Sequence, residues 1–353
     1  MEVTLSSDDP LPLESSASLL FDNLVIHPKN DQWDDISFGV IHKNVLCVTF
    51  LEKDQLPGMR LVPLRNTLNL EKPSAASVQM MQVSWCTLTS TTILLAISTE
   101  GIQIFSEMGE KLLFHHEFLS PDSGEPTWEM AQGITYAGDT IFIGCSRGDI
   151  LEIRFWSGCR EVALSRMRGC HPNTAVTALC FMTTLVRLVS ADEKGVINVW
   201  KPGDNLIRVA SSMPFESCVT CLKCWKSLII AGFATGHLRI FDLKRLLKSE
   251  PGEANSLLTL KTTAESSAHV RPVSGIAVSK RRGWALTCAE DTLIRLWELK
   301  LDKESLHCLA SVALNNAPLT GVAFLKPDAS KFAVSVYDIA ELQVYSIAEA
   351  ATA

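Results

Sequence analysis

Three closely spaced cysteines are the residues of this sequence whose spacing best suits chemistry: Cys218, Cys221 and Cys224 recur at every third position. Thiolates at such a spacing can ligate zinc or an iron–sulfur cluster. The run falls on a predicted strand, however, where positions three apart point to opposite faces. The three sulfurs therefore cannot converge without a break in the strand, and we interpret them as small core residues.

The standard sequence motifs of enzymes are absent. There is no G-x-S-x-G elbow, no Walker phosphate loop, no H-E-x-x-H zinc motif and no G-x-G-x-x-G dinucleotide motif. Catalysis would therefore require an arrangement of residues that follows none of these patterns. We predict a protein that is not an enzyme, has no catalytic residues and binds neither a cofactor nor a metal.

One basic run, Lys280, Arg281 and Arg282, lies in a predicted turn between two strands. Such a run is most often a solvated turn. The alternative is a contact with anionic lipid or a phosphorylated ligand, because each cation contributes about 1 kcal/mol beside an anionic membrane. Peripheral binding of such ligands is therefore kept as the alternative function.

The composition is that of a globular chain with a large core. Of 353 residues, 47% are hydrophobic and 20% are charged, and the formal net charge is -7. This charge has the wrong sign for neutralising phosphates and disfavours nucleic acid as a partner. No apolar run approaches the roughly 20 residues of a transmembrane helix. An odd count of 11 cysteines and a start without signal-peptide features favour the cytoplasm.

One type of segment recurs along the chain: a short apolar strand, a polar turn that often holds glycine, and an alternating strand that ends in an aromatic residue. Residues 188–200 (LVSADEKGVINVW), 229–241 (IIAGFATGHLRIF) and 285–297 (ALTCAEDTLIRLW) show the pattern best. Looser copies occupy residues 94–105, 141–153 and 332–345. Alternating hydrophobicity without helical periodicity indicates an all-β chain.

Each of these six copies follows a strand-like run. The runs begin near residues 82, 130, 176, 219, 273 and 319, which are 43 to 54 residues apart. A degenerate seventh copy begins at residue 36, 46 residues before the first of them. Units of four strands that cannot bury both faces alone arrange radially around a channel. The sequence therefore predicts a single seven-bladed β-propeller.

The ring needs a closing strand, because the last copy ends near residue 347 with too few residues left for a fourth strand. Residues 19–26 (LLFDNLVI) have strand character, and we predict that they complete the last blade. Residues 1–16 are predicted to be disordered and residues 17–350 to form the propeller, with an insertion at 244–255.

The copies resemble WD repeats, most closely in residues 285–297. In the WD-repeat family a histidine, a serine or threonine, an aspartate and a tryptophan form a hydrogen-bonded tetrad. The resemblance implies that His269, Thr287, Asp291 and Trp297 form one here. Buried imidazole, hydroxyl and indole groups each need such partners.

A second copy keeps only part of the tetrad. It retains His171, Ser190 and Trp200 but has Lys194 at the aspartate position, so its tetrad is incomplete unless Asp192 substitutes. Over almost the whole chain, the order of such departures resembles that of one particular member of the WD-repeat family; residues 82–86, 101–105, 190–200, 289–292 and 337–341 carry this resemblance.

The resemblance also implies a function, since such propellers usually engage partners through one face. Aromatic and charged residues fall at loop positions that we expect on that face: Trp128, Phe215, Phe233, Tyr337, Arg147, Glu193, Lys194 and Arg271. Side chains of these types suit a binding hot spot. The alternative is that some of them are buried in loop packing. We therefore predict a scaffold that presents one propeller face to a protein or peptide partner.

Overall fold

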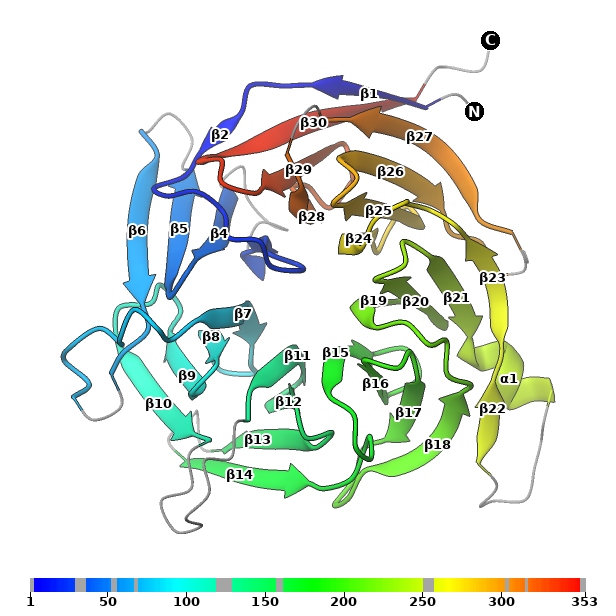
Figure 1. The fold of residues 1–353 in the computed structure, drawn as a ribbon, viewed down its shortest axis with the longest axis horizontal. Coiled ribbons are helices and arrows are strands. Elements are labelled where there is room, and N and C mark those ends of the chain that lie inside the picture. The colour runs from blue at the N-terminus through cyan, green and yellow to red at the C-terminus, as the bar shows by residue number, and fades with distance from the viewer. Residues whose placement is uncertain are drawn as a thin grey trace.

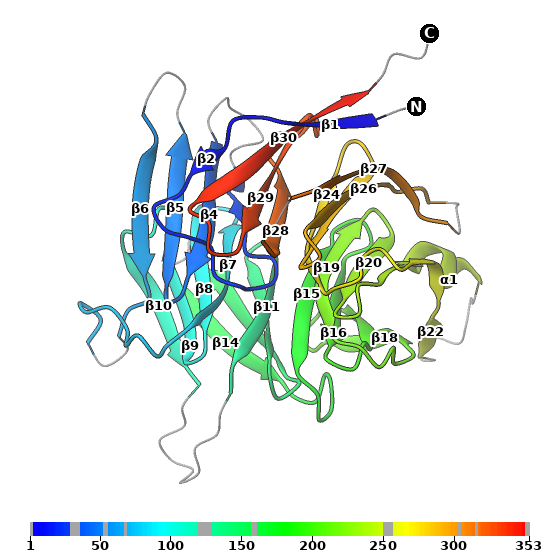
Figure 2. The ribbon, with the colours of Figure 1, turned by 45° about the horizontal axis from the view of Figure 1, so that its top comes forward.

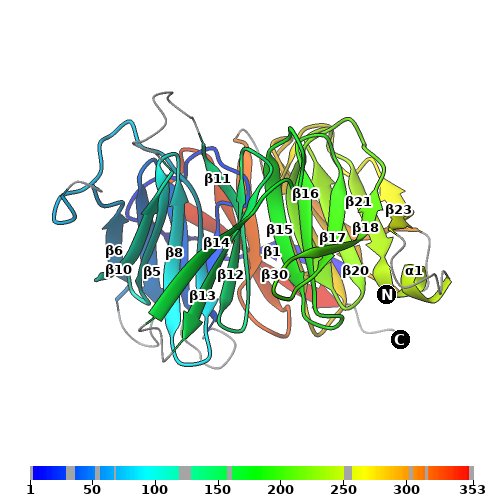
Figure 3. The same cartoon turned by 90° about the horizontal axis from the view of Figure 1, so that it is seen from below.

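The computed structural model describes residues 3–28, 36–51, 56–66, 69–118, 129–156, 161–249, 257–301, 305–314 and 317–349. Its strands form seven sheets, antiparallel except for one strand pair, that are arranged as blades around a central opening (Figure 1). Seen from the side, the blades stand upright between two faces made of loops (Figure 3). The predicted all-β seven-bladed propeller is confirmed.

Blades 2, 3 and 6 are complete meanders, in which four consecutive strands run from the channel to the rim. Their strands are β7 (Met80–Thr87), β8 (Thr92–Ser98), β9 (Gly101–Ser106) and β10 (Leu112–Glu117); β11 (Ala131–Ala137), β12 (Thr140–Cys145), β13 (Ile150–Trp156) and β14 (Glu161–Met167); and β24 (Val273–Ser279), β25 (Trp284–Ala289), β26 (Leu293–Glu298) and β27 (His307–Ala313).

Blades 4 and 5 are linked by the insertion. Their strands are β15 (Val176–Met182), β16 (Arg187–Asp192), β17 (Ile197–Lys201) and β18 (Ile207–Ser212), then β19 (Val219–Trp225), β20 (Leu228–Phe233), β21 (Leu238–Asp242) and β23 (Thr262–Ser266). After β21, helix α1 (Leu243–Ser249) precedes β22 (Leu258–Leu260), which pairs in parallel with β18 of blade 4. The predicted insertion thus starts in α1, and its residues 250–255 lie outside the described residues.

Blade 1 differs from the prediction by one strand. It contains β3 (Val25–Ile26), β4 (Ile36–His42), β5 (Val45–Leu51) and β6 (Gly58–Pro63). The run that begins at residue 36 is therefore the second strand and not the inner one. The true inner strand has only two residues, too few to show alternation in the sequence.

Blade 7 is closed by the chain's N-terminus, but not by the predicted segment. It contains β28 (Leu319–Phe324), β29 (Lys331–Val336) and β30 (Glu341–Glu349), and its outer strand is supplied by β1 (Val3–Ser7) and β2 (Leu11–Pro12). In both Figure 1 and Figure 2, β1 lies along β30. The prediction of disorder for residues 1–16 is thus wrong for the described residues 3–16, and residues 19–26 do not close the ring.

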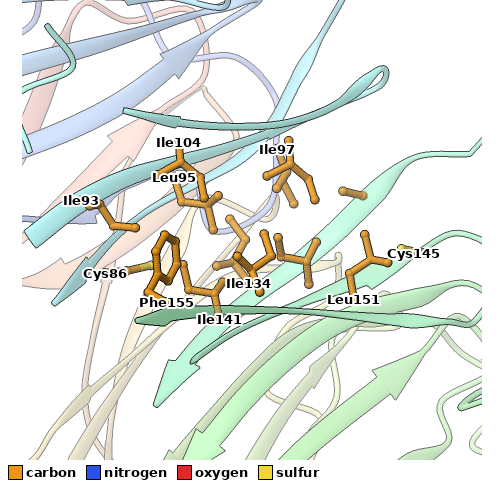
Figure 4. Packing of buried hydrophobic residues seen from close by; sticks show 14 of the residues in the cluster. Cys86, Ile93, Leu95, Ile97, Ile104, Ile134, Ile141, Cys145, Leu151 and Phe155 are labelled. Atoms are coloured by element: carbon orange, nitrogen blue, oxygen red, sulfur yellow. The ribbon is translucent and has the colours of Figure 1, made fainter. Parts of the chain in front are cut away.

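The hydrophobic core is divided among the interfaces between blades. Within the described residues, seven clusters of buried side chains each join two neighbouring blades. Between blades 2 and 3, for example, Leu95 and Ile104 face Ile134 and Ile141 (Figure 4). Each blade therefore buries both of its faces only when both neighbours are in place.

Candidate partner-binding face

A chain of hydrogen bonds runs through four side chains of blade 6. Trp297 Nε1 donates to Thr287 Oγ1 at 2.9 Å, and that hydroxyl lies 2.8 Å from His269 Nε2. The other ring nitrogen, Nδ1, lies 3.1 Å from Asp291 Oδ1. Because an indole only donates and a carboxylate only accepts, these contacts are all satisfied when His269 is neutral and protonated on Nδ1. Burial lowers the pKa of His269, although Asp291 opposes this, and so favours the neutral ring.

Blade 4 forms the same chain with a displaced aspartate. Ser190 Oγ lies 2.7 Å from both Trp200 Nε1 and His171 Nε2, and Nδ1 of His171 lies 2.9 Å from Asp192 Oδ2. Asp192 Oδ1 accepts from the backbone N–H groups of residues 194 and 196. The side chain of Lys194, at the position that Asp291 holds in blade 6, is exposed and takes no part in the network, to which this residue contributes only its backbone N–H. The aspartate therefore acts from two residues earlier in the chain, at the end of β16.

Ionisation of Asp192 is favoured in the folded protein. Burial alone raises the pKa of its carboxyl group, but hydrogen bonds from His171, the N–H of Val196 and the hydroxyl of Thr174 outweigh burial and lower it. This carboxylate thus satisfies side-chain and backbone donors together.

The two networks hold together the loops of one face. The loop that enters each inner strand packs on the preceding blade's loop between its second and third strands, as in the bond from His269 N to Gly236 O at 2.9 Å. A Cβ on Gly236, whose φ is +81°, would lie 2.0 Å from that histidine's carbonyl oxygen. Only glycine permits this approach. We call the surface formed by these two sets of loops the loop face.

Most of the predicted partner-binding residues lie at the loop face with their side chains in solvent. Arg147, Glu193, Lys194 and Arg271 are exposed, and Tyr337 is 43% exposed. The structure therefore brings these residues to one face, although they come from loops of different blades.

The predicted phenylalanines behave differently. Phe215 is half-buried, with its ring 4.7 Å from that of Phe233 and its other contacts to His237 and Arg239. Phe233 is fully buried, so its prediction as a partner-binding residue is wrong. It ends strand β20 with its side chain between blades 4 and 5. Trp128 lies outside the described residues.

Several apolar residues of the loop face were missed. Large hydrophobic side chains are exposed at six further positions: Leu19, Phe21, Met130, Met213, Val270 and Ile339. A signal was present for some of them, since Met213 and Val270 are apolar residues in loops that directly precede inner strands. No such signal was present for Leu19 and Phe21, because they lie in the segment assigned to the closing strand.

Residues 17–24, which we call the plug segment, cross the loop face from blade 7 to blade 1 and reach the mouth of the central channel. Asp22 N donates to Ser274 O of blade 6 at 2.6 Å, and Asn23 N donates to Thr320 O of blade 7 at 2.9 Å. The side-chain amide of Asn23 donates to Ile41 O of blade 1 at 3.1 Å. In Figure 1 the blue chain between β2 and β3 extends into the opening. These three hydrogen bonds join the plug segment to blades 6, 7 and 1.

Beside the plug segment is a cavity of about 390 Å³. Its walls combine Leu19, Phe21 and Asp22 with residues from the first halves of the inner strands, such as Gln82 and Leu222. Because the inner strands begin at the loop face, the cavity lies at that end of the channel. Its volume is in the range of ligand-binding pockets.

The other predicted features of chemical interest show no converging site. Burial raises the pKa of Cys221 well above its ordinary value, and Cys218 and Cys224 are half-buried. Among the residues that the structure describes, no three histidine, cysteine or acidic side chains are placed to hold a metal ion. In the basic turn, Arg282 pairs with Glu349 and lies over the ring of Trp284. None of the described helices has the length and hydrophobicity to cross a membrane.

Comparisons with known proteins agree with this fold over nearly the whole chain. A family model described as WDR54 matches residues 5–348. WD repeat-containing protein 54 of Mus musculus is 25% identical over 343 residues, which cover 94% of this chain and 96% of the relative. The protein of the same name in Homo sapiens is 23% identical over 349 residues, with 95% and 97% covered.

A solved structure shows the same architecture. One chain of a structure titled "Crystal Structure of Mitotic Checkpoint Complex" aligns with a TM-score of 0.71, covering 98% of this chain and 92% of its own length. At 11% identity this likeness concerns the fold alone. The predicted resemblance to one particular member of the WD-repeat family is confirmed by the family match.

Proposed function

Because the chain belongs to the family of WD repeat-containing protein 54 (WDR54), we propose that it is a non-catalytic interaction scaffold whose loop face binds a protein partner. The observation that carries this proposal is a set of exposed apolar side chains in the loops of one propeller face. Seven large hydrophobic residues of the loop face are 36% to 86% exposed: Leu19, Phe21, Met130, Met213, Val270, Tyr337 and Ile339.

Such a surface is typical of a protein-binding site. Exposed apolar side chains that lie together on one face mark interaction surfaces, whereas scattered ones need no explanation. Arg147, Lys194 and Arg271 supply charged groups among them, as at the polar rim of an interface. A cytoplasmic location is part of the proposal, because all cysteines of the described residues are free thiols.

The test compares two variants with equal numbers of apolar-to-serine substitutions. The loop-face variant carries Met213→Ser and Val270→Ser, and the rim variant carries Leu113→Ser and Ile207→Ser, which are 50% and 60% exposed on the outer strands β10 and β18. Proteins captured from the source cells by the wild type are quantified for each variant. We expect them to be lost from the loop-face variant and kept by the rim variant. Equal retention by both would refute the proposal.

A further inference from the structure

The cavity at the mouth of the channel is lined by two carboxylates and one ammonium group, and this net negative charge points to the chemistry of its ligand. We propose that it binds a lysine or arginine side chain of the protein partner. This inference rests on the proposed function, because the partner must approach the loop face for one of its side chains to enter.

The walls of the cavity suit the aliphatic part of such a side chain. Leu19, Phe21, Met81, Leu222 and Leu319 line it from the plug segment and from the inner strands of blades 2, 5 and 7. Basic side chains bury their methylene groups along apolar surfaces of this kind while the charged end stays with polar groups. Phe21 also offers an aromatic ring, over which an ammonium or guanidinium group is attracted.

The polar groups of the cavity are mostly unengaged. Glu290 lies in the loop between β25 and β26 and is half-exposed, and its carboxylate makes no hydrogen bond or ion pair with any described residue. The same holds for the side-chain amides of Gln82 and Gln132 on the inner strands of blades 2 and 3. All three can therefore accept hydrogen bonds from a ligand.

The cavity's own cation is already paired. Lys223 Nζ lies 2.5 Å from Asp22 Oδ2, and Asp22 has no other side-chain partner among the described residues. Burial alone would lower the pKa of Lys223, but Asp22 outweighs it and raises that pKa, so the ion pair persists. The charges that line the cavity are thus two carboxylates, Asp22 and Glu290, against one ammonium group.

A basic ligand corrects this imbalance. A lysine ammonium carries three donors and an arginine guanidinium five, and neither accepts a hydrogen bond. Glu290, the free oxygen of Asp22 and the amide oxygens of Gln82 and Gln132 can receive them. An acidic ligand would instead face Glu290 at close range, and an apolar one would leave these acceptors desolvated without partners.

The test uses a phage-displayed library of random heptapeptides, panned against the whole purified protein. We expect peptides with lysine or arginine at one fixed position. The best of them is then synthesised together with a copy in which norleucine replaces the basic residue. Loss of the basic residue should weaken binding about tenfold or more, as removal of a charge-assisted hydrogen bond does.

Two matched protein variants locate the contact. Glu290→Gln removes the unpaired carboxylate of the cavity and should weaken binding of the synthetic peptide by about tenfold. Glu216→Gln removes an exposed carboxylate of the loop face that does not line the cavity, and should leave binding unchanged. Melting temperatures of both variants establish that they are folded.

The outcomes separate this inference from the proposed function. The scaffold proposal stands if the selected peptides lose affinity for the variant with Met213→Ser and Val270→Ser. The inference is overturned if these peptides show no preference for a basic residue, or if Glu290→Gln does not weaken their binding. If no peptide depends on the loop face, or none binds at all, both are refuted.

Discussion

His171 Nδ1 and Asp192 Oδ2 lie 2.9 Å apart, and both side chains are almost completely buried. The repeat pattern puts a lysine, Lys194, at the position where blade 6 has Asp291. The contact shows that the loop conformation, and not a fixed sequence position, brings the carboxylate to the histidine.

Replacing this aspartate should therefore destabilise the protein. Asp192→Ala leaves His171 and the two backbone N–H groups of the loop without their acceptor, and we expect the free energy of unfolding to fall by about 1–3 kcal/mol. Lys194→Ala, at the exposed neighbouring position, should change it by less than about 0.5 kcal/mol. Urea denaturation measures both, and equal effects would contradict the assigned network.

Stability should also depend on pH through His269. Burial lowers its pKa below the ordinary value of 6.5, so the unfolded chain binds the proton more tightly than the folded one. The contribution of His269 is then complete above pH 6.5 and is lost as the pH falls below that value. The urea midpoint should drop between about pH 7.5 and about pH 5.5 by more in the wild type than in His269→Gln. The reverse order would show that the buried ring is protonated.

The register of the closing strand can be tested by cross-linking. Thr4 faces Ala348 across the β1–β30 pair, and both are exposed. Thr4→Cys with Ala348→Cys should form a disulfide on mild oxidation and stabilise the ring by about 3–5 kcal/mol, since it closes nearly the whole chain into a loop. Thr4→Cys with Ser346→Cys, two residues out of register, should not cross-link efficiently. Mobility on non-reducing gels decides between them.

Phe233 should affect stability and not recognition. Its side chain is completely buried in the cluster between blades 4 and 5. Phe233→Ala should lower the free energy of unfolding by about 3–5 kcal/mol, whereas Phe233→Leu should cost less than about 1.5 kcal/mol. A Phe233→Leu variant that stays folded but no longer binds a loop-face partner would assign it to the interface after all.

The sequence predicted the features that depend on local spacing. Blades 2 to 6 appear as recurring apolar runs separated by turns, because their second strands are buried on both faces between neighbouring blades. The tetrad residues could be located for a similar reason, since Thr287 and Trp297 occupy positions set by the paired strands β25 and β26, which the register fixes.

The remaining features depend on contacts that spacing does not encode. Leu19 and Phe21 belong to the apolar run 19–21, which fits a strand as well as it fits the plug segment. Val3 is the one residue of β1 that is buried. The polar run at residues 6–9 therefore resembled a disordered tail in the sequence. Phe233 was misplaced because the sequence could not fix whether β20 ended before or after it.

The pairing of β1 with β30 joins residues more than 340 positions apart, as in the contact between Thr4 and Ala348. During synthesis β1 leaves the ribosome long before its partner β30 does. The inner blades can assemble from neighbouring contacts while translation continues. Closure of the ring must wait until β30 has been translated, and a chain truncated before β30 leaves β1 with no strand to join.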